Sequence, residues 1–264
     1  MNPIEEYYCK FNEDKRFDSR HGQVEFMITM KYIDELLDSM LFKGRDKSDI
    51  KILDVGAGTG RYSIHYANEG YDVSALELVK HNLSRLKAKC SLVHARQGDG
   101  RNLSKYPDDN FDITLIFGPL YHLFNHEDKL KCLTEARRVT KPGGYILAAY
   151  VMNDYGIITY GIKEGHLKES IDNGRVDEAY NIHSDIEDLY DYVRLEEIDR
   201  LREDSGLERV RIITPDGPTN YIRPQLKAMT DEEFEIYLDY VYSISSRADM
   251  IGAAAHTVDI LKKI

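Results

Sequence analysis

Three alternating glycines, Gly56, Gly58 and Gly60, lie between a buried apolar segment and the expected start of a helix. Glycine has no Cβ, so the backbone at this point can turn sharply and approach a ligand closely. In open α/β sheets, the first strand-to-helix turn is where a nucleotide-like ligand binds. The glycines, together with Asp54 and Ala57, therefore predict a nucleotide-type site.

Two acidic residues follow at the expected ends of the next two strands. Glu77, followed by Leu78, lies about twenty residues beyond the glycine turn, where a carboxylate can accept both ribose hydroxyls of an adenosine ligand. Asp99, followed by Gly100, can accept a hydrogen bond from an adenine amino group while a neighbouring backbone N–H binds a ring nitrogen. An exposed strand-end acid and an Asp-Gly turn are the structural alternatives for these two positions.

The elements that must position these residues alternate between strand and helix. Strands are expected at 51–55, 71–78, 92–99, 111–118 and 145–151, and helices at 60–69, 80–90 and 126–139. Asn125 is the expected N-cap of the last helix, and residues 141–144 are expected to form a turn. This alternation requires right-handed crossovers and a parallel sheet that is covered on both faces.

Helical segments flank this alternation on both sides. Residues 19–42 have apolar side chains at steps of three and four, which predicts an amphipathic helix. After residue 151, segments 156–193 and 215–250 are mostly helix-like, and the second contains a capping box at Thr230 and Glu233. We expect the two segments to pack together as a lid over the strand ends; the alternative is that they extend the core sideways. Strands at 207–213 and 254–261 are expected to complete the sheet, with a short helix as the alternative for 254–261.

The order and spacing of these motifs over residues 48–151 resemble class I S-adenosylmethionine-dependent methyltransferases. The resemblance is strongest to the small-molecule branch that includes quinone-biosynthesis methyltransferases. It is carried by residues 54–60, Glu77, Asp99, 111–118 and Lys-Pro-Gly-Gly at 141–144. It implies a doubly wound, mostly parallel, seven-stranded Rossmann-like sheet with helical lid insertions.

The resemblance also implies a cofactor and the residues that hold it. The cofactor would be S-adenosyl-L-methionine, with S-adenosyl-L-homocysteine as the product. The glycine turn would hold the methionine part, Glu77 the ribose, and Asp99 the adenine amino group with Gly100 beside it. Phe117 and Gly118, at the end of the fourth strand, would flank the sulfonium.

Two departures from related patterns narrow the expected function. Residues 117–122 read Phe-Gly-Pro-Leu-Tyr-His, without the leading amide or carboxylate of the Asn/Asp-Pro-Pro-Tyr motif found in enzymes that methylate nucleic-acid bases. The dehydrogenase pattern GxGxxG is not matched cleanly either. We therefore expect methyl transfer to a small-molecule acceptor. The alternatives are methylation of a protein or RNA group, an NAD-binding Rossmann oxidoreductase, since Glu77 permits NAD, and a non-catalytic cofactor-binding regulator.

Tyr121 and His122 are the candidate catalytic residues, because they follow the fourth strand, toward which the transferable methyl group should point. A histidine has a pKa suited to accepting a proton near neutrality. The structural alternative for His122 is a cap on the next helix, and for Tyr121 it is core packing.

The N-terminal segment is a second candidate for a lid. It carries Tyr7, Tyr8, Arg16, Arg20 and His21 ahead of the first long helix. An arginine here can pair with a carboxylate on either ligand. This gives a three-part organisation: an N-terminal helical segment at 1–47, a cofactor-binding core at 48–151, and a completion of the sheet at 152–264.

Composition excludes several other classes of protein. The chain has 264 residues and a formal net charge of -11, which argues against nucleic acid as the partner. No apolar run reaches the roughly 20 residues of a membrane-spanning helix, and the polar start lacks the pattern of a signal peptide, so a cytoplasmic protein without membrane association is expected. The three cysteines lack metal-ligand spacing, which predicts reduced thiols. No metal site is expected, and no motif indicates an oligomeric state.

Overall fold

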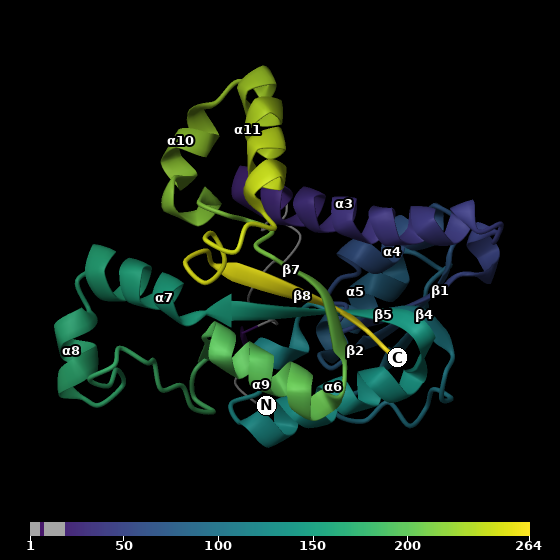
Figure 1. Cartoon of the computed structure of the whole chain (residues 1–264), viewed down its shortest axis with the longest axis horizontal. Helices are drawn as coiled ribbons and strands as arrows, with labels where there is room; N and C mark the ends of the chain where they lie inside the picture. The colour runs from purple at the N-terminus through teal and green to yellow at the C-terminus, as the bar shows by residue number, and fades with distance from the viewer. Residues whose placement is uncertain (1–5, 8–18) are drawn as a thin grey trace.

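The first long helix lies across one face of a central sheet. The computed structural model describes residues 6–7 and 19–264 (Figure 1). Helix α3 (Arg20–Phe42) begins after Ser19, whose side chain accepts a hydrogen bond from the Gly22 N–H. Its buried residues include Val24, Ile28, Ile33 and Leu37, which follow one another at steps of four and five. The predicted helix at 19–42 is therefore confirmed.

The alternating part of the chain forms the parallel half of the sheet. Its elements, after the short helix η1 (Lys47–Asp49), are β1 (Lys51–Val55), α4 (Arg61–Asn68), β2 (Asp72–Glu77), α5 (Lys80–Lys89), β3 (His94–Gln97), β4 (Phe111–Ile116), η2 (Pro119–His122), α6 (His126–Val139) and β5 (Thr140–Met152). Asn125 caps α6 by accepting a hydrogen bond from the Asp128 N–H, as predicted. The third and fourth strands are shorter than expected.

The chain completes the sheet with an antiparallel pair. The elements are β6 (Tyr192–Val193), α9 (Leu195–Ser205), β7 (Glu208–Ile213), η4 (Thr219–Tyr221), α10 (Arg223–Ala228), α11 (Asp231–Ile244) and β8 (His256–Lys262). The expected closing strand is therefore present. So is the capping box, because Thr230 and Glu233 each accept a hydrogen bond from the other's backbone N–H.

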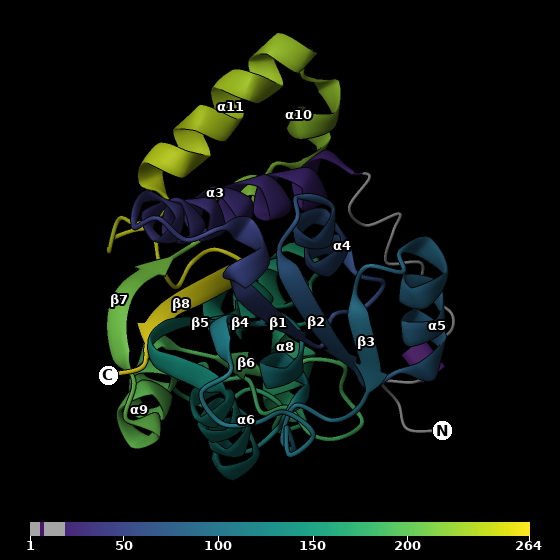
Figure 2. The same ribbon diagram turned by 90° about the vertical axis from the view of Figure 1, so that its right-hand side faces the viewer.

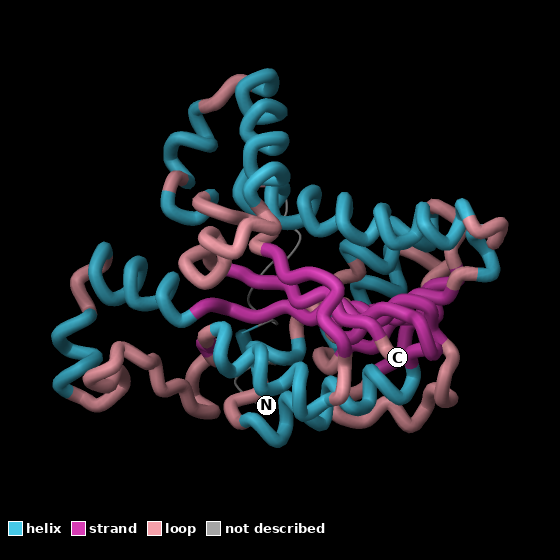
Figure 3. Tube along the Cα trace, in the orientation of Figure 1, coloured by secondary structure: helices cyan, strands magenta, loops and turns pink. Residues whose placement is uncertain are grey.

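The sheet is mostly parallel and doubly wound, as the sequence predicts. Within the described residues it has eight strands in the order β3-β2-β1-β4-β5-β8-β7, with β6 beside β5 (Figure 2). Figure 3 shows these strands in magenta with helices above and below them. The predicted number was seven; β6, two residues long, is the added strand. Helices α3 and α4 cover one face, and α6 and α9 cover the other (Figure 2). Two buried apolar clusters, one on each face, form most of the core.

The turn predicted at residues 141–144 is wrong. These residues belong to β5, which begins at Thr140. Gly143 has a φ of +79°, and its N–H donates to the Lys263 carbonyl, while the Lys263 N–H donates to the Gly144 carbonyl. Pairing with the end of the chain therefore keeps this glycine-rich stretch within the sheet.

The two inserted segments do not form the single lid that was predicted. Helices α10 and α11 pack against α3, whereas α7 (Asn153–Gly156), the π-helix η3 (Ile157–Lys163) and α8 (Leu167–Asp172) extend from the end of β5 (Figure 1). The segments meet at Tyr155 and Tyr221, whose ring centroids are 5.7 Å apart. The two insertions thus flank the carboxyl end of the sheet from two sides instead of packing together.

Two further predictions concern cysteines and membrane spans. Cys90 and Cys132 are buried and form no disulfide, while Cys9 lies outside the described residues. In the described part of the chain, no helix is both long enough and apolar enough to cross a bilayer.

A buried ion pair joins the two antiparallel strands. The side chain of Asp259 in β8 is 0% exposed, and both its oxygens accept hydrogen bonds from Arg209 in β7 at 2.7 Å. Removing one partner of a buried pair leaves an uncompensated charge, so we expect Arg209→Gln to lower the free energy of unfolding by about 3 kcal/mol in urea denaturation. Arg247→Gln, which loses an exposed pair with Asp249, is the control and should have little effect. Equal losses from the two variants would contradict the expectation.

Candidate functional site

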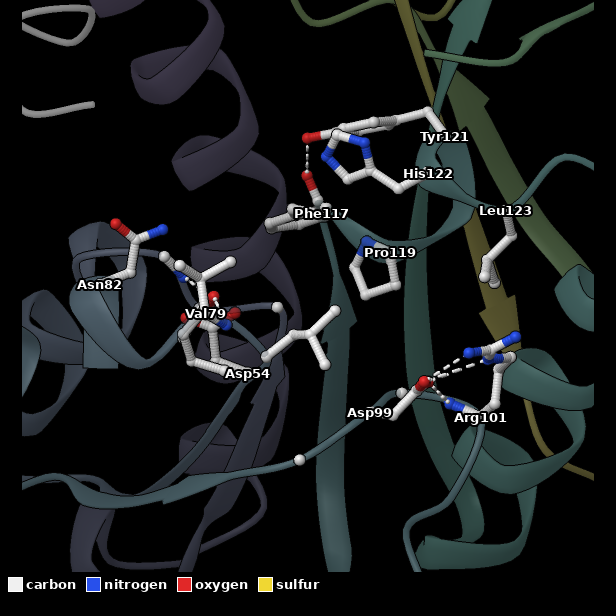
Figure 4. Close-up of a pocket in the computed structure, with 18 of the residues that line it drawn as sticks. Asp54, Val79, Asn82, Asp99, Arg101, Phe117, Pro119, Tyr121, His122 and Leu123 are labelled. Carbon is white, nitrogen blue, oxygen red and sulfur yellow. Dashed lines mark hydrogen bonds and ion pairs between the residues drawn. The ribbon is translucent and has the colours of Figure 1, made fainter. Parts of the chain in front are cut away.

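A cavity of about 370 Å³ opens at the carboxyl ends of the parallel strands (Figure 4). Its volume lies within the range of small-molecule sites. The predicted site residues that line it are Asp54, Gly56, Ala57, Gly58, Glu77, Leu78, Asp99, Gly100, Phe117, Tyr121 and His122. The structure thus brings together residues from the ends of four strands. Of the residues predicted to hold the cofactor, Gly60 does not line the cavity.

The glycine turn forms one wall of the cavity. Gly56, Gly58 and Gly60 all have positive φ values, of +77°, +56° and +91°, a region that only glycine adopts easily. The N–H groups of Gly56 and Ala57 both donate to the Leu76 carbonyl, at 2.7 and 3.1 Å. The turn is therefore fixed to the end of β2. Gly60 is the N-cap of α4, and its N–H donates to the Ala57 carbonyl at 2.9 Å, which closes the turn.

Glu77 connects this turn to the start of α5. Its side chain accepts a hydrogen bond from the Gly58 N–H and another from the Val79 N–H, both at 2.7 Å. The residue is only 5% exposed, yet it lines the cavity. The alternative of an exposed strand-end acid is therefore wrong. Each carboxylate oxygen has a second lone pair, so Glu77 retains acceptor capacity toward a ligand hydroxyl.

Two buried polar side chains lie on the same side of the cavity. Asp54, at the end of β1, accepts a hydrogen bond from the Ser63 hydroxyl of α4. Asn82, in the first turn of α5, is 3% exposed and lines the cavity (Figure 4). Sequence reasoning missed Asn82. Its position in the first turn of the helix that follows β2 was the available signal.

Asp99 lies at the opposite side of the cavity, paired with an arginine that sequence reasoning also missed. Arg101 contacts both Asp99 oxygens at 2.6 to 3.2 Å and also donates to Asp128 at 2.8 Å. Burial by itself would raise the pKa of Asp99, but the hydrogen bonds from Arg101 hold it below its usual value. An adenine amino group would therefore share this carboxylate with Arg101. Gly100 leaves little room for a side chain, since a Cβ there would lie 3.0 Å from Val55 Cγ1 and 3.1 Å from Cys132 Sγ.

The segment after β4 forms the third side of the cavity. The Tyr121 hydroxyl donates to the Phe117 carbonyl at 2.6 Å, and the Phe117 ring packs against Tyr62 with centroids 4.8 Å apart. Tyr121 and His122 lie on one side of Phe117, away from Asp99 (Figure 4). Phe117 therefore separates the part of the cavity bounded by Asp54, Asn82 and Asp99 from the part bounded by Tyr121 and His122 (Figure 4).

His122 is held as a neutral imidazole. Its Nδ1 lies 2.7 Å from the Leu189 carbonyl; since a carbonyl only accepts, Nδ1 carries the proton. Burial lowers the pKa of His122 to about 4, and the bond to Leu189 opposes this only in part. Asn125, not His122, caps α6, so the helix-cap alternative is wrong.

A distant segment fixes these two residues in place. The Tyr190 ring stacks on His122 with centroids 5.5 Å apart, and the Asp191 N–H donates to the Tyr121 carbonyl at 2.8 Å. The Asp191 carboxylate pairs with the buried ammonium of Lys129 in α6. The insertion between β5 and β6 therefore holds the loop after β4.

The residues predicted to form an N-terminal lid differ from the strand-end residues, which line the cavity. Tyr8 and Arg16 lie outside the described residues. Arg20 donates to the Thr230 carbonyl and to Asp231 at 3.0 and 2.8 Å, so it joins α3 to α11 and does not line the cavity. His21 lies beside Ser19 at 3.4 Å. Within residues 6–7 and 19–264, no three His, Cys, Asp or Glu side chains are arranged to hold a metal ion.

Comparisons with known proteins agree with this geometry. Residues 53–148 match the family model described as "Methyltransferase domain". A demethylmenaquinone methyltransferase of Renibacterium salmoninarum is 39% identical over 100 residues, which are 38% of this chain and 40% of the relative. A glycine/sarcosine N-methyltransferase of Aphanothece halophytica is 27% identical over 121 residues, covering 44% of this chain and 45% of the relative. The matches thus span less than half the length of these relatives.

The fold has close counterparts among solved structures. A SAM-dependent methyltransferase from Methanosarcina mazei superposes with a TM-score of 0.55 at 15% identity, covering 85% of this chain and 97% of the other. Identity this low is informative about the fold alone. The matched domain, the sheet order and the glycine turn with Glu77 agree with one another. Residues 53–148 therefore match a methyltransferase domain, and the chain has the fold of the solved SAM-dependent methyltransferase.

Proposed function

We propose that this protein transfers a methyl group from S-adenosyl-L-methionine to a small-molecule acceptor. The observation that carries the proposal is one cavity with two chemically different parts. Asp54, Asn82 and Asp99 bound one part, and Tyr121 and His122 bound the other, with Phe117 between them (Figure 4). A cofactor in the first part would present its methyl group toward an acceptor in the second.

The first part of the cavity fits the cofactor. Turn residues without side chains leave room for the methionine portion, and Glu77 offers carboxylate oxygens to a ribose. Asp99 and Asn82 offer polar atoms to an adenine ring. The cofactor supplies an activated methyl group on a sulfonium, so the protein's main tasks are to align the acceptor and to exclude water.

Tyr121 and His122 are proposed to orient the acceptor. A pKa of about 4 makes His122 a weak proton acceptor at neutral pH, because general bases work best with a pKa near the working pH. Its neutral imidazole can still hold a hydrogen bond from the acceptor. Tyr121, whose hydroxyl is directed to the Phe117 carbonyl, shapes the wall beside it.

We expect His122→Ala to lower kcat by about tenfold or more, since small misplacements of a reacting group are costly. Affinity for S-adenosylhomocysteine should change little, because His122 lies away from Asp54 and Asp99 (Figure 4). The wild-type rate should also show no ionisation near pH 6.5 from this residue, whose pKa is about 4. Turnover and calorimetry on His122→Ala, with the exposed His94→Ala as the control, test this. Unchanged turnover would exclude His122 from the reaction.

Two features support a small-molecule acceptor. The relatives named above act, by their names, on demethylmenaquinone and on glycine or sarcosine. The net charge of -11 disfavours a nucleic-acid substrate. Methylation of a protein or RNA group is the alternative within this class.

The decisive experiment has two steps. Calorimetry should detect binding of S-adenosylhomocysteine and no binding of NAD; the reverse would favour an oxidoreductase. Transfer of labelled methyl from the cofactor to a panel of amines, phenols and thiols, with unstructured peptides and total RNA as competing acceptors, then tests the substrate class. Cofactor binding without transfer to any acceptor would favour a non-catalytic regulator.

A further inference from the structure

Three consecutive residues from the insertion after β5 contact Tyr121 and His122, which bound the second part of the cavity. The Leu189 carbonyl accepts a hydrogen bond from His122 Nδ1 at 2.7 Å. The Tyr190 ring packs on both side chains, with its centroid 5.5 Å from that of His122 and 5.6 Å from that of Tyr121. The Asp191 N–H donates to the Tyr121 carbonyl at 2.8 Å. These contacts fix the placement of both residues, and the bond to Leu189 sets which His122 nitrogen carries the proton.

Segment 189–191 is attached both to the sheet and to α6. The residues that follow it form β6, a strand of two residues that pairs with the end of β5. The Asp191 side chain, 12% exposed, pairs with the Lys129 ammonium, 4% exposed, one turn into α6. Lys129 is not among the described residues that line the cavity. It can therefore act on the cavity through Asp191.

A gain in stability does not account for this buried ion pair. Burial raises the pKa of the Asp191 carboxylate, while the Lys129 charge opposes that rise. Taking both charges out of water is costly, and apolar residues of similar volume in their place are often as stable or more stable. A charge-assisted hydrogen bond differs from an apolar contact in being directional. The pair is therefore suited to fixing one placement of segment 189–191 relative to α6.

We propose that Lys129 is a positioning residue for methyl transfer. By holding Asp191, its ammonium keeps segment 189–191 against Tyr121 and His122 and so sets the geometry of the part of the cavity that would hold the acceptor. This inference rests on the proposed function for the role of that part, but the contacts that Lys129 controls can be measured without an acceptor. The part of the cavity assigned to the cofactor is built from the other strand ends and should not depend on Lys129.

The test replaces the ion pair by apolar residues in the double variant Lys129→Met/Asp191→Leu. Because both buried charges are removed together, the protein should stay folded. The matched control is Arg209→Met/Asp259→Leu, which removes the buried pair between β7 and β8. Thermal unfolding checks that both variants are folded.

Nitrogen NMR of labelled histidine side chains gives the first readout. The wild-type His122 signal, identified by its loss in His122→Ala, should be that of a neutral imidazole protonated on Nδ1, because that nitrogen donates to Leu189. In Lys129→Met/Asp191→Leu the segment is no longer held, the bond to Leu189 weakens, and the tautomer protonated on Nε2 should appear. The control variant should keep the wild-type signal.

Two single variants keep the test decisive if the double variant does not fold. Lys129→Arg keeps a cation opposite Asp191, and Lys129→Gln keeps a hydrogen-bond donor without the charge. The fraction of His122 protonated on Nε2 should therefore rise from Lys129→Arg to Lys129→Gln, and further to the double variant. A signal that is the same in all of the folded Lys129 variants as in wild type overturns the proposal. So does a loss of the Nδ1–H tautomer in Lys129→Arg that equals the loss in Lys129→Gln.

The reaction gives the second readout. Transfer of labelled methyl to benzylamine, phenol and thiophenol is measured at saturating cofactor. For each probe that wild type methylates, kcat should fall about tenfold or more in Lys129→Met/Asp191→Leu, since small misplacements of a reacting group are costly. The control variant should keep the wild-type kcat, and affinity for S-adenosylhomocysteine should be equal in all three proteins.

The outcomes separate this inference from the proposed function. A wild type that does not bind S-adenosylhomocysteine overturns the proposed methyl transfer. The NMR comparison needs no acceptor, so it decides whether Lys129 holds His122 even if none of the three probes is methylated. An equal change of the His122 signal in the Arg209→Met/Asp259→Leu control would show general loosening of the fold and would overturn the role of Lys129. An altered tautomer with unchanged kcat would show that this geometry does not serve the reaction.

Discussion

Replacing Glu77 by Gln is expected to raise the Kd for S-adenosylhomocysteine by about 100-fold, since charge-assisted hydrogen bonds are lost at a buried position. The two Glu77 oxygens accept from the N–H groups of Gly58 and Val79, both at 2.7 Å. A glutamine amide has one oxygen and one NH2 group. Whichever way it turns, one backbone N–H then faces another donor. The glycine turn and the start of α5 can no longer both be held, and the ribose loses a charged acceptor.

The matched control is Asp72→Asn, which removes a carboxylate from the opposite end of the same strand, β2. Calorimetry with S-adenosylhomocysteine and thermal unfolding should be measured on both variants. Asp72→Asn should bind like wild type. If Glu77→Gln kept wild-type affinity while remaining folded, Glu77 would not be a ligand of the cofactor.

The elements with strong local signals could be predicted from the sequence. Strand β1 (Lys51–Val55) and helix α6 (His126–Val139) have the predicted bounds. Each is delimited by neighbouring residues: the glycine turn follows β1, and the Asn125 side chain caps α6. Side-chain capping and glycine turns act over a few residues, so a single sequence contains the information.

The elements that depend on distant partners could not be predicted. The stretch at 141–144 has turn chemistry, but hydrogen bonds with Lys263 keep it in β5. Strand β6 is two residues long, and its pairing with the end of β5 defines it. The two insertions were expected to pack together because both interrupt a regular pattern, but α10 and α11 bury their apolar residues against α3. Tertiary packing decided all three outcomes.

The residues of the candidate site also fall into those that could be predicted from the sequence and those that could not. The glycine turn, Glu77 and Asp99 lie at predictable strand ends, so their convergence follows from a parallel sheet. Arg101, which pairs with Asp99, and Leu189, which fixes the His122 tautomer, have no local pattern that marks them. Glu25 could not be predicted as a cavity residue either. The periodicity of α3 predicts which apolar side chains of this helix are buried, but not which of its polar side chains lines the cavity.

Gly56→Ala is the second substitution for which a large effect is expected, and Gly70→Ala is its matched control. Both glycines have positive φ, +77° and +96°, so an alanine at either position should cost about 1–2 kcal/mol of stability. At Gly70 nothing lies within 4 Å of an added Cβ. At Gly56 the added Cβ would lie 2.6 Å from Pro119 Cδ, and a proline ring cannot turn aside.

The clash at Gly56 must therefore move the backbone that carries Phe117 and Tyr121 relative to the glycine turn. Gly118 is packed against this turn, since a Cβ there would lie 3.2 Å from the Gly56 carbonyl oxygen, so the two loops cannot shift independently. Because a displacement of about 1 Å at a reacting centre can cost about 100-fold in rate, kcat should fall by that order in Gly56→Ala and stay unchanged in Gly70→Ala. Affinity for S-adenosylhomocysteine should fall only in Gly56→Ala. Equal behaviour of the two variants in calorimetry and turnover would mean that contact between these loops does not control the site.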